Sequence, residues 1–536
     1  MMRGTGSWIL AAVLLAGLVA PLAASGAAAD GSPRTAKGGI RAHGDFNGDG
    51  YADLAIGVGY ENVDNVPDAG AVQVLYGSAS GLTAAGNQEF TQNTPGMLGG
   101  PAANAAKFGF AVAVGDFNHD GYADLAIGVA RDRFTPQAAG VSILYGSAAG
   151  LTVTGNQYFD ENTPGMVGLG EQAGDRFGYT VFVGDFNGDG YDDLAIGVPY
   201  KDVLAKTDAG AVHILYGSAS GLTVAGNQEF TQNTPGLFGN GADRNALFGR
   251  AIAAGDFNGD GYSDLAVGAP AENISGFTGA GAVNVMYGSP SGLQVAGSQF
   301  FSQDGANMPD QAETSDNFGL GLSAGDYNGD GYSDLAIGVP LEDFGSISNT
   351  GAVHVLYGGP GKLTAVGSQF WNLQSSGLKG GANNNDYMGS ALASADFNND
   401  GYDDLAIGDS EKTVDGNTIS GAVTVIYGSR RGLRVLGNQL FTADTLGIRI
   451  GAQHDQKFGY AVAGADFNGD GYADLAIGIR AQDVGSVVDA GAVEILNGGP
   501  TTGLTTAGSQ YWTQDSPGVL DQAEYDDRFG RALPFS

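Results

Sequence analysis

The chain contains no cysteine, few basic residues and only one long apolar run. Without cysteine it has no disulfide framework and no cysteine-based zinc or iron–sulfur site, so its stability must come from packing or from hard cations. Only 23 lysine and arginine residues stand against 58 aspartate and glutamate residues, and the formal net charge is −35. Such a surface repels phosphate backbones and anionic lipid headgroups. We therefore expect no nucleic acid and no membrane surface among the partners.

The long apolar run lies at the N-terminus, over residues 9–24. Arg3 precedes it and three alanines at 27–29 follow it, which is the pattern of an export signal. We expect residues 1–29 to be a cleaved signal peptide and residues 30–37 to be a linker. A membrane anchor is the alternative, but the run is short for a span of about 20 residues. The mature chain is therefore expected to be secreted, without a membrane span, and monomeric.

Glycine is abundant, with 93 of 536 residues, and 43% of the chain is hydrophobic. That apolar content is enough to bury a core, and the absence of a Gly-X-Y period excludes collagen. A nine-residue string, D-[FY]-N-x-D-G-Y-x-D, occurs seven times at spacings of 69 to 71 residues. Its copies begin at Asp45, Asp116, Asp185, Asp256, Asp326, Asp396 and Asp466. The whole mature chain is therefore one array of repeats.

Within one period, four short runs of β-forming residues are separated by turn residues. In the second unit they cover residues 108–115, 124–129, 140–147 and 156–159, and we name them strands A to D. Seven such units leave no open sheet edges if they close radially into a ring. We therefore predict an all-β fold, a seven-bladed β-propeller of four-stranded antiparallel blades. A linear solenoid is the alternative, but it would need polar terminal repeats, and here the first and last units keep the apolar pattern.

The repeats predict a single propeller domain over residues 38–536. Its blades are expected at about 38–92, 107–161, 176–232, 247–303, 317–374, 387–443 and 457–514. Most units begin with a Phe-Gly pair, and a further copy stands near the C-terminus at residues 529–530. We predict that residues 528–536 pair into the first blade beside residues 40–44 and close the ring. A frayed remnant of a repeat is the alternative.

The nine-residue string lies between strands A and B and has the spacing of a calcium loop. Oxygen ligands stand at positions 1, 3, 5 and 9, a backbone carbonyl is available at position 7, and glycine at position 6 permits a tight turn. An EF-hand would need glutamate at position 12, where the first copy has Ile56. A solvated turn does not need three aspartates at these positions, so we expect about seven Ca²⁺ ions with a structural role. The expected ligands are Asp45, Asn47, Asp49, Tyr51 and Asp53; Asp116, Asn118, Asp120, Tyr122 and Asp124; Asp185, Asn187, Asp189, Tyr191 and Asp193; Asp256, Asn258, Asp260, Tyr262 and Asp264; Asp326, Asn328, Asp330, Tyr332 and Asp334; Asp396, Asn398, Asp400, Tyr402 and Asp404; and Asp466, Asn468, Asp470, Tyr472 and Asp474.

Together these features resemble a known family. The Phe-Gly pair, the D-x-N-x-D-G-x-x-D loop and the Gly-Ala-Val segments at residues 70–72, 210–212 and 491–493 are similar to FG-GAP repeats, including those of the N-terminal seven-bladed propeller of integrin α subunits. The resemblance covers about residues 38–535. It implies an extracellular adhesion or recognition module whose calcium loops lie on the face away from the ligand.

Strand order separates two ends of each blade. In an antiparallel meander the A–B and C–D turns lie at one end, and the B–C and D–A loops lie at the other. The B–C loops vary from unit to unit, and variable loops on a rigid scaffold are where recognition usually takes place. We therefore predict ligand contacts there, with plain solvated loops as the alternative. The predicted ligand-binding residues are Tyr60, Arg131, Arg133, Phe134, Tyr200 and Lys201.

The sequence offers little support for an enzyme. Residues 321–325 spell Gly-x-Ser-x-Gly, but that hydrolase motif needs a strand-to-helix turn and here it falls in strand A. His213 and His354 share one position of strand C, which we expect to face solvent, so we expect no catalytic residue. The expected function is a secreted, calcium-binding adhesion or recognition propeller for an extracellular protein or glycan. An extracellular hydrolase, lyase or lectin that uses the axial mouth of the ring is the alternative.

Overall fold

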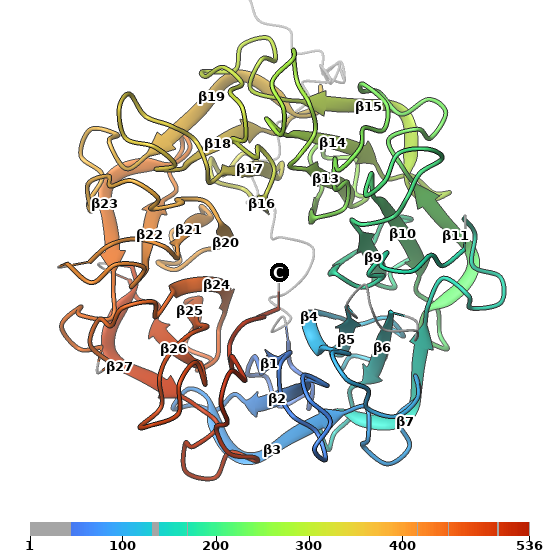
Figure 1. Ribbon diagram of the computed structural model, residues 1–536, viewed down its shortest axis with the longest axis vertical. Helices are drawn as coiled ribbons and strands as arrows, with labels where there is room; N and C mark the ends of the chain where they lie inside the picture. Colours follow the sequence, from blue (N-terminus) through green and yellow to red (C-terminus); the bar gives the residue numbers. More distant parts are fainter. Residues whose placement is uncertain are drawn as a thin grey trace, which may run out of the picture. The chain divides into compact units, whose positions relative to one another are not determined.

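The computed structural model describes residues 44–130, 139–168, 170–414, 416–448, 450–500 and 503–534. The predicted signal peptide and linker lie outside these residues, as do Arg131, Arg133 and Phe134. In the described part of the chain the strands form seven sheets arranged around a central axis (Figure 1). Six of these sheets have four strands in the order A-B-C-D, with antiparallel neighbours. The predicted seven-bladed, all-β propeller is therefore confirmed.

Strand A is innermost and strand D lies at the rim (Figure 1). The A strands are β4 (Phe108–Gly115), β8 (Thr180–Gly184), β12 (Ala251–Gly255), β16 (Gly321–Gly325), β20 (Ala391–Ala395) and β24 (Phe458–Ala465). The B strands are β1 (Leu54–Val58), β5 (Asp124–Val129), β9 (Asp193–Val198), β13 (Asp264–Ala269), β17 (Asp334–Val339), β21 (Asp404–Asp409) and β25 (Asp474–Ile479). The C strands are β2 (Ala71–Tyr76), β6 (Gly140–Tyr145), β10 (Ala211–Tyr216), β14 (Ala282–Tyr287), β18 (Ala352–Tyr357), β22 (Ala422–Tyr427) and β26 (Ala492–Asn497). The D strands are β3 (Thr83–Thr91), β7 (Thr152–Phe159), β11 (Thr223–Phe230), β15 (Gln294–Phe301), β19 (Thr364–Asn372), β23 (Arg434–Phe441) and β27 (Thr505–Trp512). We number the blades one to seven in chain order, so that β1 belongs to blade one.

The B strands are buried along their whole length and the C strands nearly so, as in β9 and β10, because the neighbouring blades cover both faces of each sheet. We predicted that the strand C position of His213 and His354 faces solvent, and this prediction is wrong. The two residues are 1% and 0% exposed. An alternating polar and apolar pattern describes a sheet with one covered face, whereas a propeller covers two. Both histidines are therefore interior residues.

Side chains of strands C and D join each blade to the next. Gln88 donates from Nε2 to the carbonyl of Leu151 in blade two at 3.0 Å, and the amide of Leu151 donates back to Gln88 Oε1 at 3.1 Å. The same exchange joins blade seven to blade one, where Gln510 and Leu82 form both bonds at 2.9 and 2.8 Å. The last junction of the ring is therefore built from the same bonds as the first.

Residues near position 530 contact the inner side of blade one. Its sheet contains only β1, β2 and β3 in the described residues, and the amide of Gly57 donates to the carbonyl of Ala532 at 2.9 Å. Phe529 pairs with Gly491 of blade seven, as Phe248 pairs with Gly210 of blade three. Phe529 and Leu533 are fully buried in one apolar cluster with residues of blades one and seven. The C-terminal segment thus lies between the two blades at the end of the ring.

Loss of the Phe529 side chain tests how much this segment stabilises the ring. Phe529→Ala removes a fully buried ring, and a change of this kind costs about 3–5 kcal/mol of unfolding free energy. Urea denaturation of the full chain measures the loss. Leu520→Ala is the control, because Leu520 lies in the connection between β27 and Phe529 but is 45% exposed, and its replacement should cost about 0.5 kcal/mol or less. Equal stability of the two variants would contradict a role in closure.

Candidate functional site

Each acidic loop is a tight turn held by its own first aspartate. In blade one, Asp45 Oδ1 accepts hydrogen bonds from the amides of Gly48 at 2.6 Å and Asp49 at 3.1 Å, and its Oδ2 accepts one from Gly50 at 2.8 Å. Gly50, at position 6, has a φ of 93°, a conformation that glycine adopts without strain. The turn therefore gathers the oxygens of positions 1, 3 and 5 over a few residues.

The aspartate at position 9 ties this turn to the rest of the blade. Asp53 is 2% exposed, and it accepts hydrogen bonds from the amide of Phe46 at Oδ2 and from the amide of Gly77 at Oδ1, both at 2.8 Å. Burial raises the pKa of Asp53 to about 8, although the two amides oppose the rise, and the charges of Asp45 and Asp49 add to it. Burial raises the pKa of every equivalent carboxyl in the same way. These carboxyls belong to Asp124, Asp193, Asp264, Asp334, Asp404 and Asp474.

These residues fit a hard cation. The donors are oxygens only, and the elevated pKa of Asp53 reports a cost of ionisation that a bound divalent cation would lower. The loops also contact one another. The amide of Ala123 donates to the carbonyl of Asp45 at 2.9 Å, and the amide of Ala52 donates to the carbonyl of Asp466 at 3.1 Å. They therefore form a continuous circle of predicted metal-binding loops on one face of the ring.

A second site lies on the opposite face, where strands A begin and strands B end. A cavity of about 360 Å³ opens there, and we call it the axial mouth. Its inner lining is formed by the residues that directly follow the Phe-Gly or Met-Gly pairs, one residue from every repeat. These residues are Phe110, Tyr179, Arg250, Leu320, Ser390, Tyr460 and Arg531. The arginine at 531 comes from the C-terminal segment, which therefore completes the lining as well as blade one.

Two arginines, Arg250 and Arg531, line the axial mouth together with one carboxyl group, that of Glu411. The guanidinium of Arg531 lies 3.6 Å from the ring centre of Phe110, and that of Arg250 lies 4.7 Å from the ring centre of Tyr179. Burial raises the pKa of the Tyr460 hydroxyl, but the nearby positive charges outweigh burial and lower this pKa to about 8. The charges that act on it, largest first, belong to Arg531, Arg480, Arg250 and Lys457. A chain with a net charge of −35 thus places several of its few basic residues around one cavity.

Two of the predicted ligand-binding residues lie beside the axial mouth. The Tyr60 ring lies under the guanidinium of Arg528 at 4.2 Å, and the Tyr200 ring contacts Tyr179 edge-on at 5.7 Å. Lys201 is placed elsewhere, because its side chain is fully buried. The residues lining the mouth were missed because they lie in or next to strand A, where the surrounding pattern is apolar. The sequence feature that could have identified them is that the residue directly after each Phe-Gly pair varies between repeats.

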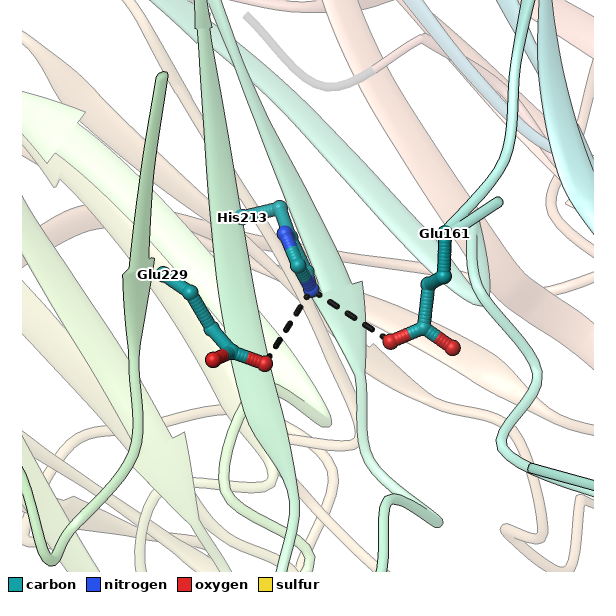
Figure 2. A group of neighbouring side chains, drawn as sticks. All are labelled: Glu161, His213 and Glu229. Carbon is teal, nitrogen blue, oxygen red and sulfur yellow. Dashed lines mark ion pairs between the residues drawn. The ribbon is translucent and has the colours of Figure 1, made fainter. Parts of the chain in front are cut away.

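Lys201 belongs to a buried charge network between blades two and three. Its ammonium lies 2.7 Å from Glu161 Oε1 and 2.8 Å from Asp175 Oδ2. Figure 2 shows the imidazole of His213 between Glu161 and Glu229, with Nε2 at 3.4 and 3.5 Å from their carboxylate oxygens. Burial opposes ionisation of Glu161, but His213 and Lys201 outweigh it and lower its pKa. The Lys201 ammonium thus provides a cation for Glu161 and Asp175.

A seven-bladed propeller with an acidic loop between the first two strands of every blade is a repeat protein built on one supersecondary unit. The sequence of that unit identifies it further. Seven stretches match the FG-GAP repeat, and the chain belongs to this family. The matched residues are 42–75, 108–145, 177–215, 248–286, 318–356, 388–426 and 458–496.

Relatives of different activities contain similar repeats. The chain is 35% identical over 241 residues to Integrin alpha-PS2 of Drosophila melanogaster, covering 44% of this chain and 15% of that protein. It is 35% identical over 184 residues to phosphatidylinositol-glycan-specific phospholipase D of Bos taurus, covering 34% of this chain and 21% of that protein. The solved rhamnogalacturonan lyase PL11 of Bacillus licheniformis matches with 15% identity and a TM-score of 0.29, over 66% of this chain and 64% of that one. The chain thus spans about a fifth or less of the two curated relatives.

The described residues contain no helix that is both long and apolar enough to cross a membrane.

His354 offers a test of how far the blade interior excludes water. It is fully buried between the rings of Phe318 and Phe370, and burial lowers its pKa to about 4. In the unfolded chain the pKa is about 6.5, so between pH 6.5 and 4 the unfolded state binds a proton that the folded state does not. The stability from a neutral His354 is therefore complete above pH 6.5 and is lost as the pH falls toward 4.

We expect His354→Gln to reduce this acid-dependent loss, by up to about 3 kcal/mol relative to the wild type between pH 7 and pH 4. Gln73 already occupies the same position in β2, which makes glutamine a tolerated replacement. Thermal melting across that pH range measures the difference. The exposed His454, changed to glutamine, should follow the wild type, and an unchanged pH profile in His354→Gln would contradict the expectation.

Proposed function

We propose that this chain is a secreted, calcium-stabilised adhesion or recognition propeller, and that it binds a carboxylate-bearing extracellular glycan at the axial mouth. The family and the similarity to an integrin α subunit support an extracellular recognition role. The single observation that carries the ligand class is the group of arginines around one cavity of a strongly acidic chain. A carboxylate is the natural partner of such a group.

The proposed calcium sites are the seven acidic loops. In blade one, carboxylate and amide oxygens of Asp45, Asn47, Asp49 and Asp53 would hold the ion together with the carbonyl of Tyr51, and the other loops would do the same. A bound Ca²⁺ supplies positive charge to carboxylates that otherwise repel one another. Because each loop bonds to the next, this charge would stabilise the contacts between blades as well as the turns themselves.

The lining of the axial mouth favours a sugar as the carrier of the carboxylate. Hydroxyl groups of Ser390, Ser410 and Tyr460 line the cavity together with the guanidinium groups of Arg250 and Arg531. Hydroxyls bond to sugar hydroxyls as donors and acceptors, and the planar arginine fork matches a carboxylate. Apolar side chains from the same repeat position supply flat contact area. A uronate residue at a chain end satisfies all three kinds of contact.

An extracellular lyase is the second candidate, and Tyr460 is the observation that favours it. A phenol with a pKa near 8 beside arginines has the properties of a general base near neutral pH. The arginines would neutralise a uronate carboxylate while the phenolate removes the proton from the adjacent carbon C5. The electron pair of that C–H bond would form the C4–C5 double bond as the glycosidic C4–O bond breaks, and the leaving oxygen would take a proton from water. Incubation of the protein with sodium alginate, followed by ultraviolet absorbance of the unsaturated product, separates this activity from binding alone.

Calcium removal tests the stabilising role of the loops. We expect EDTA to lower the melting temperature, because each site contributes about 2.7 kcal/mol at a Ca²⁺ concentration 100 times its Kd. Asp189→Asn, at position 5 of the third loop, should reduce the difference between calcium and EDTA. Asp455→Asn is the control, since this exposed aspartate lies outside the loops, with its carboxylate 3.7 Å from the ammonium of Lys457. An EDTA melting curve that matches the calcium curve would contradict structural calcium.

Binding of a polyuronate tests the ligand class. Calorimetry with sodium alginate should show binding that weakens with added salt, whereas neutral dextran should not bind. Arg250→Gln should weaken the affinity about tenfold or more, the loss expected for one charge-assisted hydrogen bond. Arg434→Gln is the matched control on the outer strand β23, where Arg434 lies 3.5 Å from Asp400. If neither polymer binds, or if both variants bind like the wild type, the glycan proposal is wrong, and an acidic protein segment becomes the next candidate.

A further inference from the structure

Three side chains meet on the face of the axial mouth at the junction of two neighbouring blades, as blades two and three show. One leaves strand D, one begins the B–C loop of the next blade, and one stands two residues before the Phe-Gly pair. At the junction of blades two and three these are Glu161, Lys201 and Asp175, and the ammonium of Lys201 contacts both carboxylates. The three positions therefore form a small buried compartment in which charge must be balanced.

Other junctions balance the same compartment in different ways. Between blades five and six, Lys412 lies 2.8 Å from Asp386. Between blades six and seven, the amides of Gln456 and Gln482 bond to each other without any charge. Where this compartment holds both a carboxylate and a lysine, the lysine ammonium contacts the carboxylate.

The junction of blades seven and one, which closes the ring, lacks such a cation. Glu61 stands where Lys201 stands at the earlier junction, and Asp527 stands where Asp175 does. Glu61, Asp527 and the neighbouring Glu524 each bring a carboxylate oxygen within 4.8 Å of the other two. In the described part of the chain, no lysine, arginine or histidine forms an ion pair with any of the three.

Buried oxygens at this junction have no hydrogen-bond partner. Asp527 is fully buried, and its Oδ1 accepts no hydrogen bond, while its Oδ2 accepts one from the amide of Glu524. Gln514 donates from Nε2 to Glu61 Oε2 at 2.6 Å, and its own buried Oε1 has no donor. A buried carboxylate oxygen without a partner is costly, so these two oxygens point to a ligand that accepts lone pairs.

We propose that the ring-closing junction binds a Ca²⁺ ion through Glu61, Glu524 and Asp527, with the side-chain oxygen of Gln514 as a further ligand. The ion takes the place that the Lys201 ammonium occupies between blades two and three. The site joins the B–C loop of blade one, the exit of β27 in blade seven and the C-terminal segment. It is separate from the acidic loops, which lie on the other face of the ring.

The donor set and its dimensions select calcium. All four ligands are oxygens, which hard cations prefer over the nitrogen and sulfur ligands of zinc. Two oxygens on opposite sides of one Ca²⁺ ion lie about 4.8 Å apart, given Ca–O distances of about 2.4 Å, whereas Mg²⁺ needs a tighter octahedron. Glu524 is exposed at the surface, so the ion and its remaining water ligands can enter from solvent.

Electrostatics at this junction agrees with the need for a cation. Burial raises the pKa of Glu61 to about 9, and the charges of Asp527 and Asp521 add to the rise. The junction of blades four and five is also acidic, with Glu342 beside Gln303. Within the described residues, however, three carboxylates come within 4.8 Å of one another only at the ring-closing junction.

Hydrogen–deuterium exchange on the full chain tests the proposal with an internal control. In the wild type, chelation of Ca²⁺ should increase exchange at residues 521–534 more than at residues 170–181, where Lys201 holds the equivalent junction. In Glu61→Lys, which installs that lysine at the ring-closing junction, the two segments should respond alike. Comparison of segments within one molecule removes the effect of calcium loss from the acidic loops, which is shared by both junctions.

Glu524→Gln provides a second variant that changes only an exposed side chain. It should raise the Ca²⁺ concentration needed to protect residues 521–534 by about tenfold or more, as loss of a metal-site contact does. Glu313→Gln is the matched control, because Glu313 donates its amide to Asp316 as Glu524 does to Asp527 but belongs to no such group of three. Equal responses of the two wild-type segments to chelation, or an unchanged Ca²⁺ midpoint in Glu524→Gln, would show that the carboxyls share a proton instead of a metal ion.

Discussion

The buried aspartate at the ninth position of each acidic loop is the contact on which the architecture depends. Its two oxygens accept amides from the start of the loop and from the turn after strand C, so a single carboxylate fixes both turns at one end of the blade. The loop, held in this way, presents the carbonyl of its first aspartate to the next blade. Blade geometry and blade-to-blade contact therefore rest on the same side chain. Replacing it would disturb two levels of structure at once.

The fold could be predicted from the sequence because the repeat contains all of its determinants. The nine-residue string marks the turn between strands A and B, and apolar runs such as residues 124–129 form strands of the expected length. Burial was harder to predict. His213 occupies a position that is polar in several blades, yet it is buried, because the neighbouring blade covers the outer face of the sheet. Residue pattern alone does not reveal which faces are covered when blades pack on both sides.

The candidate site was predicted only in part, for a related reason. Tyr60 and Tyr200 were predicted because they lie in variable loops, and both lie beside the axial mouth. Arg250 and Arg531 were missed because they lie in or next to strand A, where the surrounding pattern is apolar. Lys201 was expected at the surface, but a carboxylate from the preceding blade and another from the connecting loop draw its ammonium inward. The closed ring determines the contacts between repeats, so these contacts cannot be predicted from the sequence of a single repeat.

The completion of blade one by residues near the C-terminus has a consequence for how the chain is made. Gly57 is synthesised long before its partner Ala532, so their pairing joins segments that are far apart in the sequence of the domain. Until then the amide of Gly57 lacks this partner, and an unpaired amide at a strand edge is a template for association with another chain. Contacts of such long sequence separation form slowly. A nascent or partly unfolded chain is therefore most vulnerable to domain swapping at blade one, where a second copy offers the same C-terminal segment.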